Sequence, residues 1–338
     1  GSFIDGRHIS GLTIDSDQIR SEGLFGTIGQ GGKVQNLVLS NVNIATSNSN
    51  ASIGALAGTL EGEAVNILVT GGTVSGISNV GGLVGDTAGG AVIAASCVNV
   101  TVTSEEYNGG GLVGRLENAS VSESCSTGEV IGNAYAGGLA GSVVDSGISD
   151  SYAAGKVSGY SNVGGLIGGV MSDRDTEEAT STVERVHAVG KVVNPNASAG
   201  GLIGSVTTPI QLISAYYDKD RTGQSDQKAT SGTPLSSEEM LEEDKFEDWD
   251  FETIWHLDDR DGWPTFLRDD ERAPEMFSAK VSVDEPTKVA VRLAERIIAD
   301  DEALARFTVT VDGSEALIHQ REFDGKTLIL TLVEPVLY

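Results

Sequence analysis

The sequence predicts an all-β protein whose larger part is a right-handed parallel β-solenoid, and three observations lead to this class. A tetrapeptide of the type Gly-Leu-x-Gly recurs along the first two thirds of the chain. Between its copies, Val and Ile alternate with Ser, Thr and Asn, which is typical of β-strands. A helical period of about 3.6 residues does not appear before about residue 236. The right hand follows the general preference for right-handed crossovers.

The tetrapeptide repeat sets the size of the structural unit. Successive repeat leucines are 32, 27, 29, 27, 27 and 36 residues apart. A unit this short cannot enclose a core, whereas stacked units can pair each strand with its copy in the next turn. A propeller blade needs about 40 residues, so the period favours a solenoid of seven or eight turns. The repeat leucines are Leu24, Leu56, Leu83, Leu112, Leu139, Leu166 and Leu202.

Each repeat also predicts local geometry. The leucine and the neighbouring Val or Ile should point inward as stacked columns. The paired glycines are expected to form a sharp corner with positive φ.

Stacking places residues from different turns in one column. Cys97, Cys125, Tyr152 and His187 hold equivalent places in their repeats. Cα atoms on adjacent turns would lie about 4.8 Å apart, which is within disulfide range. Side chains in register do not readily reach the S–S torsion, so we expect two reduced, partly buried thiols, with a disulfide as the alternative. By the same logic His187 should be a packing residue.

Composition excludes several classes of function. The chain has 49 acidic and 22 basic residues, a net charge of −27, which argues against binding nucleic acid or anionic membrane surfaces. Its apolar runs are far shorter than the roughly 18 residues that a membrane span needs. High Gly (44) with low Pro (7) excludes collagen and most disordered linkers.

The repeats resemble the GLUG repeat of bacterial surface and secreted proteins. The resemblance covers about residues 3–268, from the opening Phe3–Ile14 (FIDGRHISGLTI) to the closing Trp263–Arg268 (WPTFLR). In the opening, His8 replaces the second glycine of the family pattern. Such repeats occur in adhesins, S-layer-associated proteins and some immunoglobulin A peptidases, whose zinc motif lies elsewhere in the chain. The resemblance therefore implies a domain type and a location at the cell surface.

The last part of the chain has a different pattern. Phe307–Gly313 (FTVTVDG) and Leu328–Pro335 (LILTLVEP) resemble SwmB-type immunoglobulin-like repeats of bacterial surface proteins. Val311–Ser314 reads as a turn between two strands, and Asp300–Arg306 as one helical turn. Because the family continues with a further strand, we expect a partial β-sandwich and a monomeric fragment of a larger chain.

An open solenoid end needs a cap, and aromatic residues gather where one is expected. All three tryptophans, Trp249, Trp255 and Trp263, lie there, and they predict a hydrophobic seal rather than a sugar-stacking platform. A short helix is expected near Ser236–Phe246, because Ser236 offers an N-cap. The predicted domains are a solenoid over 1–215, a capping segment over 216–272 and an immunoglobulin-like module over 273–338.

Known catalytic constellations do not stand out. The motif HExxH is absent. The four histidines are far apart in the sequence, without the short spacing typical of zinc ligands, which argues against a His-based zinc site. The insertion Ser172–Thr180, with Asp173, Asp175, Glu177 and Glu178, offers carboxylates for polysaccharide chemistry, but it reads better as a solvated loop. We therefore expect that the chain is not an enzyme.

Calcium is the cofactor that the sequence suggests. Asp218, Asp220 and Asp226 precede and follow Gly223 with the alternate spacing of a Ca²⁺ loop, although Ala229 stands where a bidentate Glu would close it. Asp258, Asp259 and Asp261 form a second acidic turn. An acidic surface loop is the simpler interpretation of both.

The predicted function is a non-enzymatic extracellular module of a bacterial cell-surface protein, acting as a rigid spacer or binding rod. Its partner would be a host or cell-wall glycan or a surface protein. One alternative is a carbohydrate-binding module using Tyr107, Tyr135 and Tyr160. Another is a polysaccharide-active enzyme using Asp173 or Asp175.

Overall fold

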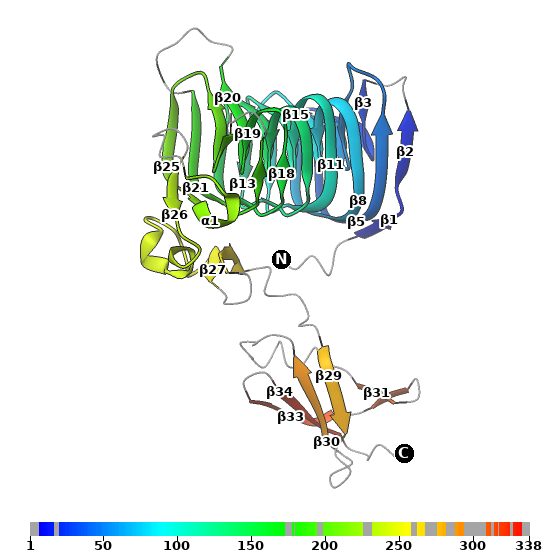
Figure 1. The fold of residues 1–338 in the computed structure, drawn as a ribbon. Helices are drawn as coiled ribbons and strands as arrows, with labels where there is room; N and C mark the ends of the chain where they lie inside the picture. The colour runs from blue at the N-terminus through cyan, green and yellow to red at the C-terminus, as the bar shows by residue number, and fades with distance from the viewer. Residues whose placement is uncertain are drawn as a thin grey trace. The chain divides into compact units, whose positions relative to one another are not determined.

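The computed structural model divides into two compact units, residues 1–268 and 269–338 (Figure 1). In the first unit it describes residues 7–16, 20–172, 178, 180–194, 199–225, 232–257 and 262–267. In the second unit it describes the strands between residues 276 and 332.

The first unit is a parallel β-solenoid of seven stacked turns, which confirms the predicted fold class. A seven-stranded parallel sheet contains one strand from each turn, and each strand begins within or directly after a repeat tetrapeptide. These strands are β4 (Phe25–Ile28), β7 (Ala57–Leu60), β9 (Val84–Thr87), β12 (Val113–Glu117), β16 (Ala140–Val144), β20 (Ile167–Met171) and β24 (Ile203–Val206).

The remaining faces of the solenoid form a 19-stranded sheet that continues around the corners of each turn (Figure 1). Its ladders are also parallel, with Leu37 opposite Ile67 and Tyr152 opposite His187. The strands are β1 (Arg7–Ser10), β2 (Thr13–Ser16), β3 (Ser21–Glu22), β5 (Lys33–Thr46), β6 (Ser52–Gly54), β8 (Glu63–Gly81), β10 (Val92–Ala94), β11 (Cys97–Gly110), β13 (Ser120–Ser122), β14 (Cys125–Ser126), β15 (Val130–Gly137), β17 (Gly147–Ala153), β18 (Val157–Ser158), β19 (Ser161–Gly164), β21 (Ser181–Ala188), β22 (Val192–Val193), β23 (Ala199–Gly200), β25 (Ile210–Asp218) and β26 (Thr233–Leu235).

The interior is an aliphatic core built from the repeated positions. Six of the seven repeat leucines are fully buried, and Leu24 of the first turn is partly buried against the same cluster. Tyr217 of the last turn is also fully buried, and its ring occupies the space in front of Gly201. The predicted inward columns are therefore confirmed.

The repeat glycines have a different role from the predicted one. None of the described repeat glycines has a positive φ. A Cβ on Gly110 would lie 1.9 Å from the Val113 carbonyl oxygen, and a Cβ on Gly137 would lie 1.9 Å from the Ala140 carbonyl oxygen. The expected left-handed corner is wrong at these positions, because glycine is needed there for close approach between backbones.

Among the non-glycine residues with positive φ, most are asparagine or aspartate, residues that tolerate this conformation. Asn79 and Asn108 have φ of 49° and 57° and stack in one column, where Asn108 Nδ2 donates to Asn79 Oδ1 at 2.8 Å. Asn66 Nδ2 likewise donates to Asn36 Oδ1 at 2.7 Å at another corner. Side-chain ladders of this kind tie successive turns together.

Cys97 and Cys125 form a disulfide between consecutive turns, so the expectation of two reduced thiols is wrong. The two residues are direct partners in the parallel register, with Cα atoms 4.5 Å apart. Both are almost completely buried. Parallel pairing holds the two Cα atoms close enough for a disulfide, and this proximity outweighs the torsional restriction on side chains in register.

The capping segment contains short elements in place of the predicted helix near Ser236–Phe246. Helix α1 (Lys219–Thr222) follows β25, and two 3-10 turns, η2 (Glu239–Leu241) and η3 (Glu243–Lys245), follow β26. Ser236 and Glu239 form the reciprocal hydrogen bonds of a capping box ahead of η2, since Glu239 N donates to Ser236 Oγ and Ser236 N donates to Glu239 Oε2. Glu242 then adopts an extended conformation, which ends the helical path.

The aromatic residues of this segment cover a flank of the solenoid. Trp249, Trp255 and Phe266 pack with the outward column that contains Cys97, Cys125, Tyr152 and Tyr216. We call this group the flank cluster; it also includes His187, Val189, Leu235, Met240 and Phe246. β27 (Trp255–Leu257) and β28 (Pro264–Phe266) pair within it as an antiparallel ribbon.

The second unit is antiparallel. One sheet has the order β29 (Met276–Val281), β30 (Lys288–Leu293), β34 (Thr327–Leu332) and β33 (Ile318–Asp324), and β31 (Val309–Val311) pairs with β32 (Ser314–Ala316) as a hairpin. Val311 pairs with Ser314 across the hairpin, and the two residues of the predicted turn between them lie outside the described residues. The helical turn expected at Asp300–Arg306 lies outside the described residues.

Candidate binding groove

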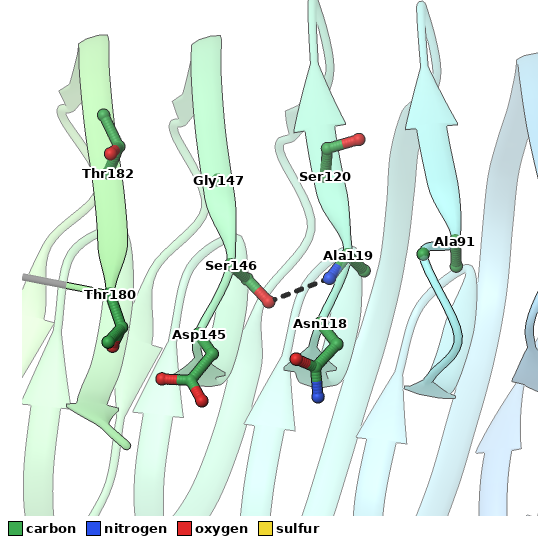
Figure 2. A pocket seen from close by; sticks show the side chains of 10 residues that line it. Ala91, Asn118, Ala119, Ser120, Asp145, Ser146, Gly147, Thr180 and Thr182 are labelled. Atoms are coloured by element: carbon green, nitrogen blue, oxygen red, sulfur yellow. Dashed lines mark hydrogen bonds between the residues drawn. The ribbon is translucent and has the colours of Figure 1, made fainter. Parts of the chain in front are cut away.

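An open groove crosses four successive turns of the solenoid at one corner (Figure 2). It lies where β9, β12, β16 and β20 of the seven-stranded sheet lead into the next face, and its volume is about 420 Å³. The lining residues are small or polar: Gly90, Ala91, Asn118, Ala119, Ser120, Asp145, Ser146, Gly147, Thr180 and Thr182.

The register explains why a hollow forms here. One column of paired residues runs Lys33, Glu63, Val92, Ser120, Gly147, Thr182 and Gln211. Long side chains stand at both ends of the column, where Lys33 Nζ lies 2.8 Å from Glu63 Oε2 and Thr182 Oγ1 donates to Gln211 Oε1 at 3.4 Å. The shorter side chains between them leave the groove.

Buried serines hold the floor of the groove. Ser146 Oγ accepts a hydrogen bond from Ala119 N at 3.1 Å and donates to Val144 O at 2.7 Å. Ser146 N in turn donates to Ser181 Oγ at 3.2 Å. Side-chain oxygens therefore link backbone groups of three turns, which keeps this corner in one conformation.

The acidic insertion Ser172–Thr180 begins and ends at the groove. Ser172 Oγ donates to Asp145 Oδ1 at 2.7 Å, and Thr180 lines the groove itself. Glu178 is exposed, whereas Asp173, Asp175 and Glu177 lie outside the described residues. The nearby Arg185 forms a bidentate salt bridge with Asp150, in which Nε donates to Oδ1 at 2.8 Å and Nη2 donates to Oδ2 at 2.9 Å. The same guanidinium also donates to Glu184 Oε1.

A second charged cluster lies on β9 and β12, and sequence reasoning missed it. Arg115 Nη1 contacts Glu117 Oε2 and lies 3.8 Å from Asp86 Oδ1. Burial raises the pKa of Asp86 to about 6, although the Arg115 guanidinium acts in the opposite direction. Only the register reveals this cluster, because Asp86 and Arg115 are paired across turns and 29 positions apart in the printed sequence.

The predicted calcium ligands have other partners where the structure describes them. Asp218 is fully buried and caps α1, where its Oδ1 accepts from the backbone N–H groups of Asp220 and Arg221 at 2.9 Å. Its Oδ2 accepts from Ser237 Oγ at 2.7 Å. Asp226, Asp258, Asp259 and Asp261 lie outside the described residues. The described residues contain no cluster of three or more His, Cys, Asp or Glu arranged to hold a metal, and calcium binding stays a prediction.

His187 is a packing residue, as its column predicted. Its ring is fully buried and stacks on Tyr152, with centroids 5.1 Å apart. Nε2 lies 2.7 Å from the Pro264 carbonyl oxygen, so the neutral ring donates from this nitrogen. Burial lowers the pKa of His187 to about 3, and the side chain stays neutral at physiological pH.

The register brings together the three tyrosines of the carbohydrate-binding alternative, which look scattered in the sequence. Tyr107 pairs with Ala134, the neighbour of Tyr135, and Ala134 pairs with Ser161, the neighbour of Tyr160. Tyr107 and Tyr160 are strongly exposed, whereas the Tyr135 ring lies over Gly169. These tyrosines lie at the corner before β12, β16 and β20, whereas the groove lies at the corner after these strands. The tyrosines therefore do not line the groove.

The tryptophans of the cap are not available for sugar stacking. Trp255 is fully buried and Trp249 nearly so, both inside the flank cluster. Trp263 is partly buried beneath the Arg221 guanidinium, whose central carbon lies 4.4 Å from the ring centroid. This arrangement agrees with the predicted hydrophobic seal, placed on a flank.

Comparisons with known proteins find partial matches to two much longer proteins. A Gly-rich protein of Evansella cellulosilytica, named as a candidate membrane protein, is 39% identical over 85 residues, 23% of this chain and 10% of that protein. Halomucin of Haloquadratum walsbyi is 40% identical over 96 residues, 28% of this chain and 1% of that protein. The chain thus spans only a small part of both relatives. No family model matches it, and the resemblance to GLUG and SwmB-type repeats stays a prediction.

A solved structure shares the fold. A candidate immunoglobulin A1 protease from Bacteroides ovatus aligns over 78% of this chain and 76% of its own, with a TM-score of 0.50 and 16% identity. A second solved chain, named IgA1 protease, aligns over 64% of this chain and 17% of its own, with a TM-score of 0.43 and 20% identity.

These names correct one expectation. The prediction that the chain is not an enzyme is wrong as an inference from a repeat fold without recognised catalytic motifs, because a solved chain with this fold is named as a candidate protease. At 16% identity the likeness shows the fold alone.

Within the part of the chain that the structure describes, no helix has the length and apolar character needed to cross a bilayer.

Proposed function

We propose that the chain is a rigid extracellular module of a bacterial cell-surface protein, which holds other parts of that protein away from the cell. The observation that carries the proposal is the Cys97–Cys125 disulfide, which joins consecutive turns of an uninterrupted parallel ladder. Disulfides persist in oxidising compartments and are rare in the cytosol. The bond therefore supports a location outside the cell, and the surface-type relatives support the same location.

The ladder supports the mechanical part of the proposal. Neighbouring turns are joined by backbone hydrogen bonds on every face, by asparagine ladders at the corners and by one covalent bond. Bending at any junction between two turns strains the contacts of that junction on several faces at once. A net charge of −27 adds solubility and opposes self-association.

The experiment is antibody labelling of intact cells that produce the parent protein, beside permeabilised cells of the same culture. The proposal expects strong labelling of intact cells, with little increase on permeabilisation. Labelling that appears only after permeabilisation would place the chain inside the cell and contradict the proposal.

A further inference from the structure

The groove of Figure 2 has the shape of a site for an elongated ligand. It crosses four turns, and three intervals of about 4.8 Å make it roughly 14 Å long. Its middle is open, because a Cβ on Gly147 would meet no atom within 4 Å. A compact ligand would leave most of this length empty, whereas an extended chain would fill it.

The polar groups of the groove are matched to hydroxyl groups. Within the described part of the chain, no hydrogen bond is made by the Asn118 side chain or by Ser120 Oγ, and the buried Thr180 Oγ1 also lacks a partner. Amide and hydroxyl groups both donate and accept, as sugar hydroxyls do. Hydroxyl groups of a ligand would pair with the Asn118 amide and with Ser120 Oγ, because both residues are exposed in the groove.

An extended peptide fits this corner less well. Peptides that lie along a sheet add a strand to an unpaired edge. Here β13 and β17 are hydrogen-bonded to neighbours on both sides, from β10 through to β21. Recognition must therefore come from side chains, as for a glycan.

Charge narrows the class of glycan. Of the described residues that line the groove, Asp145 alone is charged, and the chain as a whole carries −27. Uronates and sulfated sugars would meet repulsion from both. We infer that the groove binds a neutral, extended glycan across four turns, with Asn118, Ser120 and Thr182 as hydrogen-bonding partners.

The test is calorimetric titration of the full chain with three linear neutral probes, cellohexaose, mannohexaose and N-acetylchitohexaose, and with polygalacturonate as the anionic comparison. We expect at least one neutral probe to bind and polygalacturonate not to bind. Binding of none of the three, or preferred binding of polygalacturonate, would overturn the inference.

Two variants locate the site. Gly147→Trp fills the groove without a clash at Cβ, and we expect affinity for the bound probe to fall about tenfold or more. Gly29→Trp is the matched control, since its Cβ also points into open space but Gly29 does not line the groove. Unchanged affinity in Gly147→Trp, or equal loss in both variants, would overturn the inference.

A third variant keeps the test decisive if Gly147→Trp does not fold. Ser120→Ala combined with Thr182→Ala removes two hydroxyl groups from the groove and adds no bulk. We expect weaker binding of the same probe with an unchanged far-UV circular dichroism spectrum. Full affinity in this double variant would contradict the inference.

Discussion

The solenoid interior and the flank cluster are two solutions to burying apolar surface in one chain. The interior repeats the same aliphatic positions in successive turns, and the backbone of each repeat leucine from Leu56 to Leu166 donates a hydrogen bond to the next repeat leucine. The flank cluster is aromatic and does not repeat: Trp255, Phe266 and Tyr152 meet once, from segments about a hundred residues apart. The interior therefore depends on identity between turns, and the flank cluster on complementarity between unlike segments.

The largest expected effect comes from the interior. Gly137→Ala places a Cβ 1.9 Å from the Ala140 carbonyl oxygen and 2.6 Å from Gly168 N, and both atoms belong to backbone that cannot move aside. We expect a loss of about 3 kcal/mol or more in the free energy of unfolding, measured by urea titration.

Gly147→Ala is the matched control for that substitution. Its Cβ meets open space, so the protein should gain about 0.5 kcal/mol from the reduced flexibility of the unfolded chain. Equal effects of the two substitutions would contradict the account of close backbone approach.

The next effect lies in the flank cluster. Trp255→Ala removes a fully buried ring that contacts Tyr152, His187, Trp249 and Phe266, and we expect a loss of about 3–5 kcal/mol. Leu241→Ala, at an exposed leucine of the same segment, should change stability by less than about 0.5 kcal/mol. Thermal unfolding followed by circular dichroism measures both.

Removing the disulfide should have a somewhat smaller effect. The bond spans 28 residues, and the chain-entropy estimate for the unfolded state gives about 3.6 kcal/mol. The double variant Cys97→Ser, Cys125→Ser should therefore unfold at lower urea concentration than the wild type. Identical midpoints under non-reducing conditions would show that the bond adds nothing to stability.

The smallest effect, per pH unit, concerns His187. Its pKa is about 3 in the folded protein and near 6.5 when unfolded, so only the unfolded state takes up a proton between these values. Stability should therefore fall as pH drops through this window, by up to about 1.4 kcal/mol per unit.

His187→Phe isolates that contribution and should flatten this part of the stability–pH curve. Asp86 acts in the opposite sense: its pKa is raised to about 6, so its contribution to stability is lost as pH rises from 3.8 to 6. An unchanged slope in His187→Phe would show that another group controls acid unfolding.

The two regions also differ in how far the sequence predicts them. The turn count, the inward leucines and the shared column of Cys97, Cys125, Tyr152 and His187 follow from the repeat. Each of these positions recurs in several turns, so the sequence shows it more than once. The packing of Trp255 in the flank cluster and the hydrogen bond of His187 to a carbonyl group each occur once, between residues that are distant in sequence. Periodicity holds no information about them.

The groove is intermediate in how far the sequence predicts it. The small residues Ser120 and Gly147 are visible in the sequence, but only the register shows that they share a column bounded by Glu63 and Gln211. The role of the repeat glycines was missed for a related reason. Positive φ and close backbone approach select the same residue type, and only coordinates separate them.

The most direct test of the account is the thiol state of Cys97 and Cys125 in the parent protein recovered from the outside of producing cells. Intact cells would be alkylated without reductant, and the released protein digested and analysed by mass spectrometry. The account predicts one cross-linked peptide pair joining Cys97 to Cys125 and no alkylated cysteine at either position. Two alkylated cysteines in folded protein would contradict it, since they would show that the turns stack without the bond and that the chain is not held in an oxidising compartment.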